Sequence, residues 1–201
     1  MLASEVKSRP VYAVLEPDLQ AASNIVVCDR AGAVAVIDML GKGGAEFANK
    51  TTVLLCADDY PDAGSIDLDV ARLQPARTTV LPNINAAAAA LGERLFRAQM
   101  GARIYAAGSE PLIGSAVQRA MRFGVDHLSV RAEHRGSLKR RVQCVHCKGL
   151  TENVMASPVT CSHCGLTLVV RDHYSRRHAA FIGVCVDAEV AGEVPEQVPF
   201  Q

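Results

Sequence analysis

The sequence predicts an α/β fold in which a domain with a parallel, helix-covered sheet is followed by a small domain built around four cysteines. Three observations predict this architecture. Short apolar runs alternate with helix-like segments through the first two thirds of the 201-residue chain. Two Cys-x2-Cys pairs follow in the last third. Aromatic residues make up only 4% of the chain, with no Trp, so the core is expected to consist of Val, Leu, Ile and Ala.

The first predicted strand is the apolar run 24–27. The segment 33–40 that follows has apolar positions too dense for a surface helix, which is typical of a helix packed on a sheet. Gly41 and Gly43 are expected to end this helix, because glycine is common after the last turn.

Two further strands are predicted by β-branched apolar runs at 51–56 and 78–81. The acidic, proline-containing segment 57–62 after the first of them is typical of a loop. Neither run has the length of a helix, so both fit buried parallel strands.

The next helix is predicted over 86–100, with Asn83 or Asn85 as its N-cap and Gly101 after its end. Another short apolar run, 103–106, predicts the following strand.

Ser109 is expected to cap one more helix, with Glu110 and Pro111 in its first turn, where a carboxylate favours the helix dipole and Pro loses no hydrogen bond. Gly124 is expected to end it before a strand at 125–130. The resulting β-α-β-α-β order predicts a parallel sheet with helices on both faces.

The strongest motif is the pattern C-x2-C-x13-C-x2-C. Its members are Cys144, Cys147, Cys161 and Cys164. Two residues between paired thiolates let a tight turn direct both sulfurs at one ion, and Gly149 and Gly165 stand where such turns tighten. A segment of this size with few aromatics cannot fold on its core alone, whereas structural zinc contributes on the order of 10 kcal/mol. The pattern therefore predicts a small zinc ribbon.

The spacing leaves the identity of the metal open, because a single iron ion uses the same four thiolates. His146 and His163 lie inside the two turns and are expected to support the ligands or face solvent. The other cysteines, Cys28, Cys56 and Cys185, lie in apolar runs and are expected to be buried without a reactive role.

Charge divides the chain into segments. Lys plus Arg and Asp plus Glu are both 21, but residues 134–178 hold eight basic and two acidic residues, and residues 179–201 hold four acidic and none basic. We therefore place the α/β domain at 1–134 and the ribbon with its acidic tail at 135–201. The Cys pairs suit a reducing compartment, and neither a secretory signal nor a membrane span is recognisable, so the protein is expected in the cytoplasm.

A nucleic-acid-binding ribbon is an alternative, motivated by the basic residues Arg135, Lys139, Arg140 and Arg141. The zero net charge and the scarcity of stacking aromatics argue against it. The polar segment His173 to Arg177 is expected to be a charged surface presented to a partner rather than a catalytic cluster.

The N-terminal part resembles the Rossmann-like nucleotide lobe of ferredoxin-reductase-type flavoenzymes. The resemblance is carried by 104–112, with Ala107 where that family has Cys, and by the late Glu133. Residues 25–35 stand where the family has a glycine-rich phosphate loop, but only Gly32 remains. Since those glycines let the backbone approach a pyrophosphate, the lobe is expected to bind NADPH poorly or not at all.

The C-terminal third resembles the small zinc-binding subunit of dimethylamine monooxygenase, a haem-dependent oxidative N-demethylase complex, through 141–147, 161–165 and 173–177. The resemblance implies a haem catalytic subunit that converts dimethylamine to methylamine and formaldehyde with oxygen and NADPH electrons. It also implies a flavin (FMN) and iron–sulfur reductase subunit and a folate-binding subunit.

The sequence thus predicts an accessory subunit of an oxidoreductase complex, with structural zinc and no catalytic or cofactor-binding residue of its own. Haem, FMN, iron–sulfur cluster, NADPH and folate are expected only on partner subunits. The alternatives are a rubredoxin-like iron electron carrier that feeds an oxygenase and the nucleic-acid module.

Overall fold

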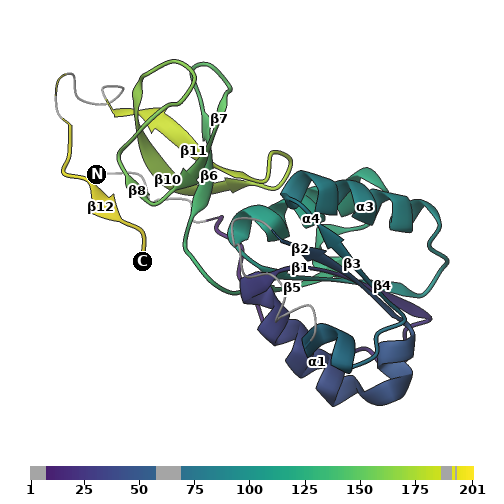
Figure 1. Ribbon diagram of the computed structural model, residues 1–201. Coiled ribbons are helices and arrows are strands. Elements are labelled where there is room, and N and C mark those ends of the chain that lie inside the picture. The colour runs from purple at the N-terminus through teal and green to yellow at the C-terminus, as the bar shows by residue number, and fades with distance from the viewer. Residues whose placement is uncertain (1–7, 58–68, 187–191, 193) are drawn as a thin grey trace. The chain divides into compact units, whose positions relative to one another are not determined.

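The computed structural model describes residues 8–57, 69–186, 192 and 194–201 (Figure 1). The chain divides into two compact units. The first unit is residues 12–137, and the second joins the N-terminal residues up to Val11 with residues 138–201. Residues 58–62 of the predicted polar loop lie outside the described residues.

The first unit contains a five-stranded parallel sheet of order β3-β2-β1-β4-β5. Its strands are β1 (Ser23–Asp29), β2 (Thr51–Cys56), β3 (Arg77–Leu81), β4 (Ala102–Gly108) and β5 (Val130–His134). The predicted parallel sheet is confirmed. Strand order reverses between β1 and β4, which makes the carboxyl ends of these two strands the topological switch point of the sheet.

Helices cover both faces of this sheet, as predicted (Figure 1). They are α1 (Arg30–Asn49), α3 (Ile84–Phe96) and α4 (Glu110–Arg122). A core under α1 includes Val26, Met39 and Tyr105, and a separate core under α3 and α4 includes Leu54 and Leu91. Alternate residues of each strand therefore supply the two cores, as the two-residue period of a strand requires.

The helix after β1 breaks at Gly44, directly after the two glycines that were expected to end it. Gly44 has φ +69° and ψ −174°, which are not helical, and a second helical segment follows it to Asn49. Phe47 and Ala48 are buried, and a side chain at Gly43 would collide with the Phe47 ring. The predicted end near Gly41 and Gly43 is thus confirmed for the first helical segment, and burial of Phe47 and Ala48 stabilises the short segment after the break.

Two predicted boundaries are wrong. The helix predicted to reach residue 100 ends at Phe96, followed by exposed residues that have no core to cover. The strand predicted at 125–130 begins only at Val130. The Asp126 carboxylate accepts a hydrogen bond from the Leu128 N–H (2.8 Å) and favours a 3-10 turn before the strand.

The second unit is a small β-domain with one five-stranded sheet of order β7-β6-β11-β10-β9. Its strands are β6 (Arg140–Cys144), β7 (Leu150–Val154), β9 (Val159–Thr160), β10 (Thr167–Ser175) and β11 (Ala180–Cys185). A second ladder pairs β8 (Ala156–Ser157) with β12 (Val198–Pro199). The core of this unit contains few large side chains besides Leu168, Tyr174 and Phe181.

The first and last described residues of the chain contact the second unit. The Ser8 N–H donates to the Asp172 carbonyl (3.0 Å), and the Ser8 hydroxyl accepts from the Tyr174 N–H (2.8 Å). The buried Arg140 guanidinium lies 4.3 Å from the centre of the Phe181 ring and 4.0 Å from that of Phe200. These contacts anchor the described termini on the small β-domain.

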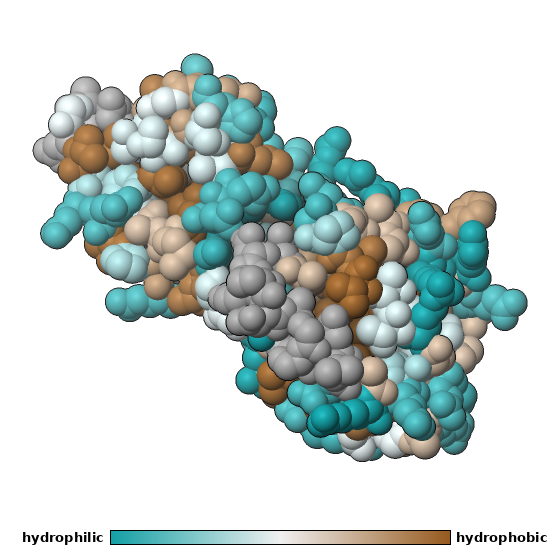
Figure 2. Space-filling view, viewed as in Figure 1, coloured by the Kyte–Doolittle hydropathy of each residue, from teal (hydrophilic) through white to brown (hydrophobic). Residues whose placement is uncertain are grey.

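Figure 2 shows hydrophilic residues spread over the visible face of each unit, with smaller hydrophobic groups between them. Among the described residues, no helix combines the length and the apolar character that crossing a bilayer requires.

An acidic residue before β1 gives the first unit a pH-dependent stability. The Asp18 carboxylate accepts a hydrogen bond from Arg103 Nε (2.7 Å) and lies 3.2 Å from an Arg131 nitrogen. The hydrogen bond from Arg103 is the main cause that holds the pKa of Asp18 below its ordinary value. Because the folded-state pKa is lowered, the stabilisation is present above the unfolded pKa of about 3.9 and is lost as pH falls through the lowered value.

We therefore expect Asp18→Asn to flatten the acid limb of stability. Urea-unfolding midpoints measured from about pH 6 down to about pH 2 should converge with those of the wild type at the acid end. Asp38→Asn on the exposed face of α1 is the control and should follow the wild type. A variant Asp18→Asn with the same pH dependence as the wild type would contradict this account.

Candidate metal centre

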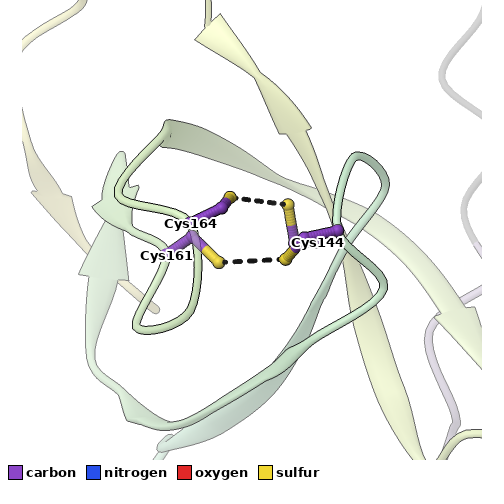
Figure 3. Close-up of side chains that lie close together, drawn as sticks. Cys144, Cys161 and Cys164 are labelled. Carbon is purple, nitrogen blue, oxygen red and sulfur yellow. Dashed lines mark hydrogen bonds between the residues drawn. The ribbon is translucent and has the colours of Figure 1, made fainter.

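Four cysteines of the second unit bring their sulfurs together in one cluster (Figure 3). Cys144 ends β6, Cys147 follows in the turn, and Cys161 and Cys164 lie in the turn between β9 and β10. All four Sγ atoms lie within 4.8 Å of one another, with 3.8 Å between Cys144 and Cys164 and 3.7 Å between Cys147 and Cys161. The predicted quartet is thus assembled from two turns 13 residues apart in the sequence.

The backbone builds the two turns in the same way. The Lys148 N–H donates to the Cys144 carbonyl (3.0 Å), and the Gly165 N–H donates to the Cys161 carbonyl (3.1 Å). Lys148 and Gly165 occupy equivalent positions directly after the second cysteine, and both have positive φ, +63° and +75°. Equivalent turns present two sulfurs each from opposite sides.

Gly149 was expected to tighten the first turn, but that position is taken by Lys148. Gly149 serves a different purpose, since a side chain there would collide with the ring of His163. The His163 Nε2 lies 2.9 Å from the Leu150 carbonyl oxygen. His163 therefore connects the second turn to the strand after the first, while His146 is exposed.

The environment of the sulfurs favours a first thiolate at Cys161. Burial raises the pKa of Cys161, but the N–H groups of Cys164 and His163, with the thiols of Cys164 and Cys147, stabilise the thiolate and lower the pKa to about 6. The Leu166 N–H lowers the pKa of Cys164, but burial and three neighbouring cysteine sulfurs raise it to about 12. A cation among the sulfurs would therefore favour further thiolates in the cluster.

The sulfur positions fit a tetrahedral ion. With metal–sulfur bonds of about 2.3 Å, a regular tetrahedron of sulfurs has edges of about 3.8 Å. Two of the sulfur separations, 3.7 and 3.8 Å, match this edge and are far longer than a disulfide bond. The four residues could hold zinc or a single iron ion, and they close the coordination shell without an open position for substrate.

The basic residues that suggested nucleic-acid binding are largely paired with carboxylates. The pairs are Arg135 with Glu133 (2.6 Å), Arg140 with Asp172 (3.2 Å) and Arg141 with Glu152 (2.6 Å). The guanidinium of Arg140 is also buried. Three of the four basic side chains thus form ion pairs within their own units, which reduces the positive charge available to bind phosphates.

The segment His173 to Arg177 is only partly a surface. Tyr174 is buried and packs edge-on against Phe181 at 5.0 Å between ring centres, while His173 and Arg177 are exposed. Of the cysteines outside the cluster, Cys28 and Cys56 are buried as expected, whereas Cys185 is partly exposed.

The switch point of the parallel sheet holds an acidic side chain. Asp29 ends β1, and its Oδ1 accepts a hydrogen bond from the Gly32 N–H (2.9 Å) at the start of α1. Its Oδ2 accepts from the Ser109 N–H (2.7 Å) at the start of α4. Gly108 leaves room for this carboxylate, since a side chain there would overlap it. One carboxylate therefore caps two helices.

This carboxylate stands where dinucleotide-binding folds place a pyrophosphate, at the N-terminus of the first helix beside the switch point. Gly32, the glycine kept from the phosphate-loop pattern, is required for packing, because a side chain there would overlap the Ala107 carbonyl. The bridge between Asp29 and Ser109 spans 80 positions of sequence and was missed by sequence reasoning. The only hint of this bridge in the sequence was the acidic residue Asp29, which follows the first predicted strand.

Fold and site together define a class of two-part proteins, in which a doubly wound α/β unit is joined to a small β-domain with four convergent thiols. The chain belongs to the family described as dimethylamine monooxygenase subunit DmmA-like. Residues 4–130 match its N-terminal domain and residues 141–184 its C-terminal domain.

A curated relative agrees with this assignment. Over 130 residues the chain is 31% identical to the "Heme-dependent oxidative N-demethylase delta subunit" of Ectopseudomonas mendocina (strain ymp). The alignment covers 64% of this chain and 73% of the relative. The family resemblance noted from the C-terminal motifs is thereby confirmed.

Proposed function

We propose that the chain is an accessory, non-catalytic zinc-binding subunit of an NADPH-dependent dimethylamine monooxygenase complex. The complex would convert dimethylamine to methylamine and formaldehyde. The observation that carries this proposal is the match of both parts of the chain to one subunit family, together with similarity to a delta subunit. A delta subunit implies other subunits, and we assign haem, FMN, iron–sulfur and folate binding to them.

Zinc is the proposed ion at the four-cysteine cluster. A redox-silent ion suits a site that is closed by four protein ligands and belongs to a unit with a small core. Metal analysis of the purified chain should give one zinc per chain and no visible absorption. A red, reducible preparation containing iron would instead support the electron-carrier alternative. Four cysteines that converge on one ion instead of pairing as disulfides also favour a cytoplasmic location.

The α/β unit is proposed to serve as a scaffold that does not bind NADPH. The support is the Asp29 carboxylate, which accepts a hydrogen bond from the Gly32 N–H at the N-terminus of the first helix, where a pyrophosphate would bind, and would repel the negative charge of that pyrophosphate. Electron transfer from NADPH would then take place on the partner subunits and not on this chain.

The test is purification of the chain from cells that express the complete complex. We expect a haem-containing protein and a flavin and iron–sulfur protein to copurify with it, and the isolated chain to oxidise no NADPH. Enzymic NADPH oxidation by the isolated chain, or purification without a haem protein under conditions that keep the enzyme active, would refute the proposal.

A further inference from the structure

Large apolar side chains are exposed where α3 and α4 end. They are Phe96, Met100, Met121, Phe123 and Leu128, called here the end patch. The exposed fractions of Phe96, Met100 and Leu128 are 81%, 96% and 81%. Single exposed apolar residues are ordinary, but a group of this size on one edge is typical of an interaction surface.

The topology brings these residues to one edge of the first unit. Both helices follow strands of the same parallel sheet and pack side by side, so both end at the edge where the strands begin (Figure 1). A side-chain carbon on Gly92 would lie 3.3 Å from the Phe123 ring. The end of α4 therefore contacts α3 one turn before Phe96. Met100 and Leu128 lie in the turns directly before β4 and β5, at the same edge.

Three arginines accompany the end patch. Arg94 and Arg97 are in the last turn and C-cap of α3, and Arg122 is the last residue of α4. None of the three forms an ion pair with another described residue. Cations at helix C-termini favour the helix dipole. That effect accounts for the charges but not for the apolar side chains exposed among them.

The composition of this edge is that of a protein interface. Aromatic residues, Met and Arg are enriched at interfaces, whereas Lys is depleted. Residues 51–138 contain no lysine at all. The edge is also the one opposite Asp29, so that docking there leaves the switch point untouched.

We propose that the end patch with Arg94, Arg97 and Arg122 is the surface by which this chain docks onto another protein subunit. That subunit's matching surface is apolar and also carries carboxylates, because three guanidinium groups that form no ion pair with another described residue lie at the ends of the same two helices. This inference rests on the proposed function, and it adds the contact surface and the chemistry of the partner.

The test uses the complete complex with two sets of variants in this chain. Phe96→Ser/Met100→Ser/Leu128→Ser removes the apolar centre, and Arg94→Glu/Arg97→Glu/Arg122→Glu reverses the charge. Five of the six positions are exposed and Arg94 is half-buried, and wild-type unfolding midpoints and zinc content verify the fold of each variant. Val34→Ser on α1 and Arg72→Glu, both exposed, are the matched controls.

We expect the apolar set to weaken association by about 100-fold or more. The charge-reversed set should weaken association about 10-fold. Added salt should lower the affinity of the wild type but leave that of the charge-reversed set unchanged. The controls should bind as the wild type does. Wild-type affinity in both sets of variants would overturn this inference but not the proposed function. Dimerisation of the wild-type chain through the end patch would overturn it as well. Absence of any partner on the wild-type chain would instead refute the proposed function.

Discussion

Replacing Cys161 by Ser is expected to release the metal and unfold the second unit. Removing one thiolate leaves three ligands, and the bound ion supplies on the order of 10 kcal/mol in comparable structural sites. The core of this unit has few large side chains to compensate. Zinc content should fall from one per chain to near zero, and proteolysis should begin within residues 138–201.

The matched control is Cys185→Ser, which changes a partly exposed cysteine outside the cluster and should keep both zinc and protease resistance. A strong chelator should reproduce the effect of Cys161→Ser in the wild type. Because the first unit has its own two cores, its urea unfolding should persist in both cases. Unchanged zinc content and protease resistance in Cys161→Ser would contradict the assignment of the metal centre.

Replacing Asp29 by Ala is expected to lower the free energy of unfolding of the first unit by about 3 kcal/mol. The change deletes two hydrogen bonds to a charged group, each worth about 1.5 kcal/mol or more, and removes the caps of two helices together. Urea denaturation followed by far-ultraviolet circular dichroism measures the loss.

Asp29→Asn separates the two caps. An amide oxygen can still accept one hydrogen bond, but the amide nitrogen cannot accept the other, so an intermediate loss is expected. If Asp29 stands in for a bound anion, inorganic phosphate should stabilise Asp29→Ala more than the wild type. A loss below about 0.5 kcal/mol, the level of ordinary surface substitutions, would show that the carboxylate does not hold the helices.

Two glycines of the α/β unit are explained by packing within the chain and not by ligand binding. Gly32 is needed because α1 passes over the Ala107 carbonyl, and Gly108 is needed because the Asp29 carboxylate lies against it. Both requirements are internal to the chain. The unit therefore keeps the shape of a dinucleotide-binding lobe while its anion-binding N–H groups are occupied by its own side chain.

The sequence by itself determined the features that depend on neighbouring residues. Strand runs such as 51–56 and the N-cap at Asn83 follow from local apolar patterns and local hydrogen bonds, and the structure has both. The four-cysteine cluster was equally predictable, because a two-residue spacing directs each pair of sulfurs from within a single turn.

Only the tertiary structure decided the features that depend on distant contacts. A second helical segment follows the break at Gly44 in α1, and its Phe47 is buried in the core of the unit. Asp29 reaches Ser109 only because the sheet places β1 beside β4. The end patch exists because two helices separated in sequence end at one edge of the sheet. Such contacts are set by the packing of the whole unit, and no local pattern of residues records them.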